Sequence, residues 1–179
     1  MNLCISRAAR VLRAGGVVSC PTEGVFGLSC MPDNAMAVMQ LLAIKQRDPA
    51  KGLILIAASK EQLRDWIAIP PGQIPDPEPT RPVTWIVPAA AGVSMLVRGD
   101  HAGLAVRVTS NPTARALCVA VDSPLVSTSA NLAGEPVAAN QFVLRRKFAG
   151  RVDYIVPGAC GPSSGPSEIR VLTSGQRLR

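Results

Sequence analysis

Hydrophobic positions along the chain follow two different periods. Apolar residues recur at helical spacing over residues 6–14 and again over 34–45, whereas Leu53 to Ala58 is a short continuous apolar run. Such a run is typical of a strand that is buried on both faces. The pattern therefore predicts helices that alternate with buried strands, as in an α/β or mixed α+β domain built on a twisted, open sheet with flanking helices.

Start and stop signals extend this prediction to the rest of the chain. Asp33 or Asn34 caps the second helix, and Ser59 with Gln62 resembles a capping box that opens another. Further helices are expected to begin at Asn111 and Asn140. The other strands are expected at 17–20, 83–87, 104–108, 124–127, 152–156 and 169–172. In the helix that ends at Lys45, the side facing the core is expected to carry Met36, Met39, Leu42 and Ala43.

Two segments interrupt the alternation. Residues 69–82 are rich in proline and predict an irregular crossing loop, and residues 157–166 form a loop of glycine, proline and serine. Neither divides the chain into parts of different composition. With 179 residues, the chain is expected to fold as one domain over residues 1–179 and to bury a core without disulfides.

The charge balance indicates what the surface attracts. The chain has 19 Lys and Arg against 12 Asp and Glu, a net charge of +7, and a pI near 9.7. Such a surface attracts phosphate, whether as nucleic acid or as a nucleotide. Aromatic residues make up only 3% of the chain, which disfavours a protein that stacks single-stranded bases.

Composition also limits location and metal chemistry. No apolar run approaches the roughly 20 residues that span a membrane. Five cysteines without C-x-x-C spacing, and no secretory signal, favour reduced thiols in a cytoplasmic protein. The chain has one histidine, His101, which we expect at the surface, so we expect no metal bound by protein ligands alone.

One motif is a decoy. Gly161 to Gly165 matches the G-x-S-x-G pattern of a hydrolase nucleophile. That pattern needs a helix directly after it and a histidine later in the chain, but Pro166 follows and His101 precedes it. The motif therefore does not predict a hydrolase.

Phosphate must be held without a phosphate-binding glycine loop, because neither G-x-x-x-x-G-K-[ST] nor G-x-G-x-x-G occurs. Lys45 and Arg47 are the best candidates: in an extended segment they would point to the same side and could clamp a polyphosphate. The alternative is that they merely decorate a helix C-terminus, where the dipole favours cations.

Polar residues also follow two strands. Ser127, Ser129 and Asn131 come after an apolar strand, where α/β sheets bind ligands, and Thr22 follows the strand at 17–20. A polar turn that only caps the next helix or strand would show the same sequence pattern.

These segments together resemble one family, the TsaC/YrdC threonylcarbamoyl-AMP synthases. The resemblance covers residues 8 to 179 in order, through the following segments: Pro21-Thr22-Glu23-Gly24-Val25-Phe26-Gly27-Leu28, Lys45-Gln46-Arg47, Lys51-Gly52-Leu53-Ile54-Leu55-Ile56, Leu104-Ala105-Val106-Arg107-Val108, Ser127-Thr128-Ser129-Ala130-Asn131 and Pro166-Ser167-Glu168-Ile169-Arg170.

The resemblance implies an enzyme that makes L-threonylcarbamoyladenylate from L-threonine, bicarbonate and ATP and releases pyrophosphate. Mg²⁺ is expected with ATP. The product would serve a tRNA-modifying threonylcarbamoyl transferase complex, which acts on the adenosine next to the anticodon. The implied fold is a twisted open sheet, largely parallel with antiparallel parts, around a large basic concave cavity.

The resemblance also implies roles for individual residues. Lys45 and Arg47 match a K-x-R pair on the ATP phosphates and are the implied catalytic residues. Ser129 and Asn131 match an S-x-N pair at the nucleotide, which Arg179 would also approach. The implied threonine-binding residues are Thr22, Ser127, Ser167 and Arg107.

Two positions depart from the family pattern. Asp48 stands before Pro49, where many relatives have a proline directly after K-x-R, and Ala57-Ala58 replace a region where two-domain relatives carry a histidine. Two rival functions remain. One is a module that binds double-stranded RNA or tRNA through Arg145, Arg146, Lys147 and Arg151. The other, a carbamoyl-transfer module of hydrogenase maturation, lacks its usual cysteine zinc motifs here.

Overall fold

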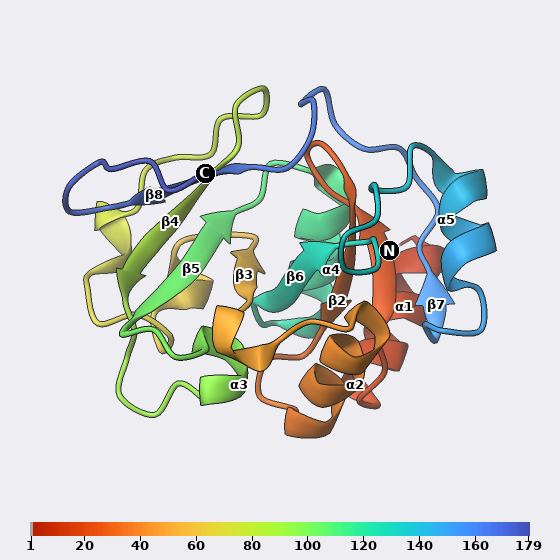
Figure 1. Ribbon diagram of the computed structural model, residues 1–179, viewed down its shortest axis with the longest axis horizontal. Helices are drawn as coiled ribbons and strands as arrows, with labels where there is room; N and C mark the ends of the chain where they lie inside the picture. Colours follow the sequence, from red (N-terminus) through yellow and green to blue (C-terminus); the bar gives the residue numbers. More distant parts are fainter. Residues whose placement is uncertain (1) are drawn as a thin grey trace.

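An eight-stranded mixed sheet forms the centre of the computed structural model, which describes residues 2–179 (Figure 1). The strands are β1 (Val18–Pro21), β2 (Phe26–Cys30), β3 (Ile54–Ala57), β4 (Val83–Pro88), β5 (Gly103–Val108), β6 (Leu125–Ser129), β7 (Tyr154–Ile155) and β8 (Glu168–Val171). The α-helices are α1 (Leu3–Arg13), α2 (Ala35–Lys45), α3 (Met95–Arg98), α4 (Pro112–Val121) and α5 (Gln141–Phe148). The predicted fold class, an open mixed sheet with flanking helices, is confirmed.

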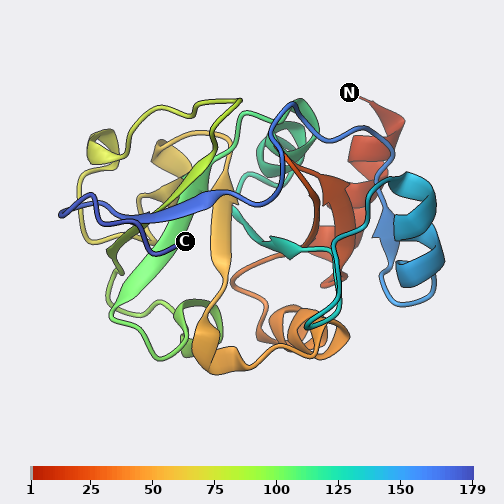
Figure 2. The same ribbon diagram turned by 45° about the horizontal axis from the view of Figure 1, so that its top comes forward.

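The strand order β7-β1-β2-β6-β3-β5-β4-β8 joins distant parts of the chain. Three neighbouring pairs are parallel, β1 with β7, β3 with β5 and β4 with β8, and the other four are antiparallel. The sheet is therefore mixed, and not largely parallel as the resemblance had implied. Both edge strands, β7 and β8, come from the last quarter of the chain, and Figures 1 and 2 show β8 and β7 at opposite sides of the molecule.

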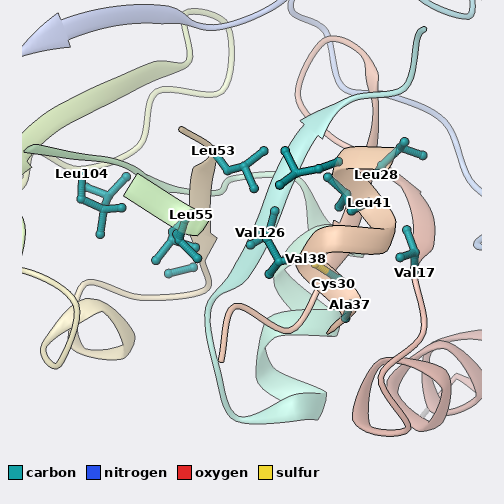
Figure 3. Packing of buried hydrophobic residues seen from close by; sticks show 14 of the residues in the cluster. Val17, Leu28, Cys30, Ala37, Val38, Leu41, Leu53, Leu55, Leu104 and Val126 are labelled. Carbon is teal, nitrogen blue, oxygen red and sulfur yellow. The ribbon is translucent and has the colours of Figure 1, made fainter. Parts of the chain in front are cut away.

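Helices cover the two faces of the sheet unequally. In β3, Leu55 belongs to a hydrophobic cluster with α2 and α3, while Ile56 belongs to a second cluster with α1 and α4. Figure 3 shows the first cluster, in which Leu55 and Val126 lie near Val38 of α2. Because successive strand residues point to opposite faces, β3 is buried on both, as its apolar run predicted.

Part of the sheet face beneath α1 and α4 remains uncovered. Ile54, Ala105 and Ser127 are register partners across β5, β3 and β6, so they lie side by side on one face. This is the face of Ile56 and Leu125, which pack in the cluster of α1 and α4. Beyond the reach of those two helices, the face is open and forms the floor of a cavity.

Asparagine caps begin three helices where the sequence predicts them. The side chain of Asn34 accepts a hydrogen bond from the Ala37 amide at 3.0 Å, and Asn140 accepts one from Val143 at 3.0 Å. Asn111 caps α4 and also donates to the Thr22 carbonyl at 2.9 Å. Each cap satisfies amide donors that a helix start would otherwise leave unpaired.

Two elements were not predicted. β2 contains Gly27 and Ser29, which weaken the strand pattern, yet all its residues are buried. α3 has four residues, too few to show a helical period.

Two predictions were wrong. The segment after Ser59 forms only a one-turn 3-10 helix, because the Gln62 side chain accepts from the Ala58 amide and donates to the Cys118 carbonyl instead of capping a helix. On α2, Met36 and Met39 are exposed, and so is Ala43. Leu42 is buried as predicted, and the helix buries Ala37, Val38 and Leu41 with it. Every residue of α2 except Gln40 and Lys45 is apolar, so the hydrophobic period did not identify the face that is buried.

Within residues 2–179, no helix is long and apolar enough to cross a membrane.

Candidate functional site

A cavity of about 350 Å³ lies on the uncovered face of the sheet. Its floor includes Gly27, Ile54, Ala105 and Ser127. Five cationic side chains line it: Arg47, Lys51, Arg98, Arg107 and Arg179. Within the described residues, the single acidic side chain on the lining is that of Glu23. The cavity therefore suits an anionic ligand.

Lys45 ends α2 and binds the end of β6 and the loop that follows it instead of lining the cavity. Its ammonium donates to the carbonyls of Ser129 and Asn131 at 2.8 and 2.9 Å, and to Asn131 Oδ1 at 2.8 Å. The Ser129 hydroxyl donates to the same Oδ1 at 2.7 Å. Since an ammonium has three protons, these contacts use all of them. Lys45, Ser129 and Asn131 thus form one unit, which we call the lysine cage.

The predicted side-by-side clamp of Lys45 and Arg47 is not what forms. Gln46, between them, adopts the left-handed conformation (φ 52°), so the segment is not extended and the two side chains diverge. Arg47 lines the cavity, where its Nε and Nη2 donate to the Gly52 carbonyl at 3.1 and 2.9 Å. Asp48 accepts a bond from the Ala50 amide at 2.9 Å and starts a one-turn 3-10 helix.

Burial and like charges lower the pKa values of these cations. Burial, with the nearby charge of Arg47, lowers the pKa of Lys45 to about 8. The pKa of Arg47 is lowered by burial and by the charge of Arg179, and partly restored by Asp48. Arg47 and Arg179 thus repel each other across a cavity that an anion would stabilise.

Ser127 and Thr22 lie on either side of Gly27. A Cβ atom at Gly27 would stand 3.1 Å from the Ser127 hydroxyl oxygen and 3.3 Å from the Thr22 methyl carbon. The Thr22 hydroxyl donates to the Val25 carbonyl at 2.7 Å, which fixes the turn between β1 and β2. All three residues line the cavity. The glycine therefore leaves room between two polar side chains on the cavity floor.

Glu23 and Arg107 form a buried ion pair on the cavity lining, with Glu23 Oε2 and Arg107 Nη2 3.2 Å apart. Burial alone would raise the pKa of Glu23, but the Arg107 charge and hydrogen bonds from Thr109 and Ser110 outweigh it, so the pKa is lowered. The pKa of Arg107 is lowered by burial and raised by Glu23. Both groups are charged at neutral pH.

The C-terminal segment supplies one wall. The Arg179 guanidinium donates to the Ser167 carbonyl at 3.1 Å, and the Ser167 hydroxyl shares a 2.8 Å hydrogen bond with that of Thr84. A bridge between Arg170 and Arg177 folds the tail back along β8. Arg179 and Ser167 both line the cavity, as the sequence predicted for residues of the site.

The G-x-S-x-G segment has a packing role. The Gly161 amide donates to the Thr22 carbonyl at 2.9 Å and the Ser163 amide to the Glu23 carbonyl at 3.1 Å. A Cβ at Gly24 would lie 2.1 Å from the Gly165 carbonyl oxygen. The loop is pressed against the turn that carries Thr22 and Glu23, and it fixes that turn.

Seven of the nine predicted site residues line the cavity: Thr22, Arg47, Arg107, Ser127, Ser129, Ser167 and Arg179. Lys45 and Asn131 stand behind it, in the lysine cage. Sequence reasoning assigned no role to Glu23, Lys51, Arg98 or His101, which also line it. Glu23 and Lys51 fall inside motifs that were recognised, so the signal was present. Arg98 and His101 lie outside every recognised motif, so nothing in the sequence marked them. Arg98 donates to the His101 carbonyl at 2.6 Å, and His101 is exposed as predicted.

The thiols and acidic groups suggest no further chemistry. Cys20, Cys30 and Cys118 are buried, and burial raises the pKa of the Cys20 and Cys30 thiols to about 12. Such thiols are poor nucleophiles. Within residues 2–179, no three His, Cys, Asp or Glu side chains are grouped as metal ligands would be.

Known proteins match this chain over its length. It is 45% identical to a threonylcarbamoyl-AMP synthase of Nitrosococcus oceani, over 99% of this chain and 98% of that protein. A threonylcarbamoyl-AMP synthase of Xanthomonas euvesicatoria is 44% identical, with the same coverage. The crystal structure of P. abyssi Sua5 complexed with L-threonine superposes with a TM-score of 0.85 at 26% identity. It covers 97% of this chain, which spans about half (52%) of the Sua5 chain.

The family assignment rests on sequence as well as on fold. The model of the Sua5, YciO and YrdC proteins, described as "Telomere recombination", matches residues 10–179. That range includes every site residue named above. The chain belongs to the Sua5/YciO/YrdC family.

Proposed function

We propose that this chain makes L-threonylcarbamoyladenylate from L-threonine, bicarbonate and ATP, with release of pyrophosphate. The observation that carries the proposal is the cavity itself, in which five cationic side chains face one carboxylate. The curated relatives at 44–45% identity bear the name of this synthase. The Sua5 structure with threonine bound supports threonine as the amino-acid substrate.

The chemistry suits a site without a protein nucleophile. The threonine amine and bicarbonate form a carbamate with loss of water, and the carbamate carboxylate then attacks the α-phosphorus of ATP and displaces pyrophosphate. An enclosed cavity protects the labile carbamate from water. Catalysis then depends on positioning and on neutralising phosphate charge.

The cavity cations supply that charge. We assign Arg47 and Arg179 to the phosphates, since burial lowers the pKa of both guanidinium groups, the charge of Arg179 lowers that of Arg47 further, and a bound anion would offset these effects. Ser129, which lines the cavity, would orient the nucleotide, and Lys45 and Asn131 hold it in place from behind. Thr22, Ser127 and Ser167 also line the cavity, and their hydroxyl groups offer polar contacts for threonine.

Mg²⁺ would enter with the ATP phosphates as part of the substrate. The cavity has one carboxylate side chain, Glu23, and that group is paired with Arg107. Mg²⁺ commonly binds through substrate phosphates and water with few protein ligands. The donor set therefore fits Mg²⁺ delivered by ATP and provides no separate protein site.

The product is unstable, so we propose that a tRNA-modifying threonylcarbamoyl transferase complex consumes it in the cytoplasm. Contact with tRNA is a related proposal. Arg145, Arg146 and Arg151, on α5 and the turn after it, are exposed, and Arg7 of α1 stacks 5.0 Å from the Tyr154 ring beside them. RNA binding at this surface should weaken steeply with salt.

The test is threonine-dependent formation of pyrophosphate and of a labelled adenylate from ATP, Mg²⁺ and labelled bicarbonate. Arg47→Ala should reduce turnover about 100-fold, as for loss of one preorganised donor. Lys45→Ala should also reduce turnover, because Ser129 then loses the ammonium that holds it at the cavity lining. Arg64→Ala removes an exposed cation outside the cavity and should keep normal turnover. Products without threonine, or salt-sensitive RNA binding with no products at all, would refute the synthase.

A further inference from the structure

Three of the five cavity cations come from two short segments that lie far apart in the sequence. Arg47 and Lys51 belong to the turn between α2 and β3, and Arg98 ends α3. Figures 1 and 2 show α3 beside that turn. Strand β4 and the proline-rich loop separate the two segments along the chain. The spacing of their cations is therefore set by how the segments pack against each other.

These cations gather at one end of the cavity, where β3 and β5 begin side by side. The two strands are parallel neighbours. Arg47 donates to the Gly52 carbonyl just before β3, and Arg98 donates to the His101 carbonyl just before β5. Arg107 lies four residues along β5, roughly 13 Å from the start of that strand. The cations at the strand starts are thus separate from the Arg107 end, and they suit the triphosphate of ATP.

The two segments are joined through their backbones. The Leu53 amide donates to the Val97 carbonyl at 2.7 Å, and the Asp100 amide donates to the Ala50 carbonyl at 3.1 Å. Between its two bonded residues, each segment has one buried glycine. Backbone therefore meets backbone at this point, with no side chain in between.

Neither glycine has space for a side chain. A Cβ atom at Gly52 would stand 2.6 Å from the Arg98 carbonyl oxygen. One at Gly99 would collide with the Ala50 carbonyl and stand 2.5 Å from the Gly52 amide nitrogen. Both glycines also have a positive φ, 61° and 69°, which strains other residues. We call this contact of Gly52 and Gly99 the glycine joint. A side chain in the joint would push Arg47 and Arg98 apart.

We propose that Gly99 is a positioning residue, which keeps Arg47 and Arg98 at the spacing that the ATP phosphates require. The Gly52 carbonyl holds Nε and Nη2 of Arg47, so a shift of that peptide turns the guanidinium. Within residues 2–179, Arg47 Nη1 and Arg98 Nη2 make no hydrogen bond and are free for a ligand. This inference rests on the proposed function and adds Arg98 to the residues that bind ATP.

The first test is Gly99→Ala. We expect the KM for ATP to rise about 10- to 100-fold, as for a small misplacement of binding groups, while the KM for threonine stays within about twofold. Gly92→Ala is the matched control: Gly92 precedes α3 and has a positive φ of 96°, but a Cβ there meets nothing within 4 Å. It adds backbone strain without a collision and should change neither KM. An equal rise in both KM values for Gly99→Ala, or no rise for ATP, would overturn the proposal.

The second test asks whether Gly99 acts through the two arginines. The probe is inorganic tripolyphosphate, which Gly99→Ala should bind about 10-fold more weakly than wild type. In a protein that already carries Arg47→Ala and Arg98→Ala, adding Gly99→Ala should weaken binding by less than about twofold, because the cations that it positions are absent. The same loss in both backgrounds would mean that Gly99 acts elsewhere and would overturn the proposal.

The third test uses wild-type protein and therefore does not depend on the folding of a variant. The amides of Leu53 and Asp100 cross the glycine joint, so bound tripolyphosphate should slow their hydrogen exchange. The Val156 amide, which donates to the Ser19 carbonyl at 2.8 Å outside the cavity, should exchange at an unchanged rate. Slowing of all three amides alike, or of none, would overturn the proposal. Failure of the synthase function looks different, because wild-type protein would then form no threonine-dependent pyrophosphate.

Discussion

Two polar clusters border the cavity, and they differ in how completely their hydrogen bonds are formed. In the lysine cage, every proton of Lys45 has an acceptor, and Asn131 Oδ1 accepts from both Lys45 and Ser129. In the pair of Glu23 and Arg107, one atom on each side has none. The saturated cluster is held together by hydrogen bonds, whereas the unsaturated pair is held mainly by the attraction of its two charges and by the hydrogen bonds to Glu23 Oε1.

The largest effect should come from breaking the unsaturated pair. Arg107→Met leaves the Glu23 carboxylate buried without its counter-charge, and should lower the free energy of unfolding by about 3–5 kcal/mol. Urea denaturation measures this. Adding Glu23→Gln should recover part of the loss, and Arg115→Met, at an exposed site on α4, should have little effect. A loss no larger than that of Arg115→Met would contradict the buried-pair argument.

A smaller loss of stability is expected from the lysine cage. Lys45→Met removes the ammonium donor to the Asn131 carbonyl and leaves the Ser129 carbonyl with only the Asn131 amide, and it should cost about 1–3 kcal/mol in unfolding free energy. Because Lys45 and Asn131 share one network, Lys45→Met and Asn131→Ala should be non-additive by about 0.5–3 kcal/mol in a double-mutant cycle. Strict additivity would mean that the cage is not a unit.

The pH dependence of activity sharpens the comparison. A lysine is charged below its pKa, which is about 8 for Lys45, so kcat/KM for ATP should fall as the pH rises through about 8. Glu23, whose pKa is lowered, stays ionised over this range. Lys45→Arg keeps the charge and should shift the fall to higher pH. An unchanged profile in that variant would exclude Lys45 as its cause.

The smallest effect belongs to an exposed ion pair. Lys60 and Asp76 approach to 2.7 Å, but the Asp76 side chain is 88% exposed. Asp76→Asn should change the unfolding free energy by less than about 1 kcal/mol, measured by the same urea denaturation. A loss comparable to that of Arg107→Met would show that burial does not determine how much each ion pair contributes to stability.

Much of the fold follows from local sequence, and its exceptions have physical causes. Strands with apolar runs and helices with asparagine caps were predicted close to their bounds. β2 was missed because burial of Phe26 and Leu28 compensates for Gly27 and Ser29, and burial comes from packing that no local pattern records.

The site also has features that the sequence predicts and features that depend on the fold. Motif order identified the residues that line the cavity, but not which of their polar atoms are satisfied. Lys45 reaches acceptors more than 80 residues away, and Glu23 meets Arg107 across the same distance in sequence. Such pairings depend on strand order, so spacing could not reveal that Lys45 and Arg47 diverge or that Glu23 has an unused oxygen.

The late position of β8 and its tail has a consequence for the order of folding. The other seven strands precede β8 in the chain and can pair before β8 joins the edge of the sheet. Until β8 joins, the cavity lacks the wall that Ser167 and Arg179 form. A ligand stabilises only the states that bind it, so substrates should stabilise the complete fold and not an intermediate without β8.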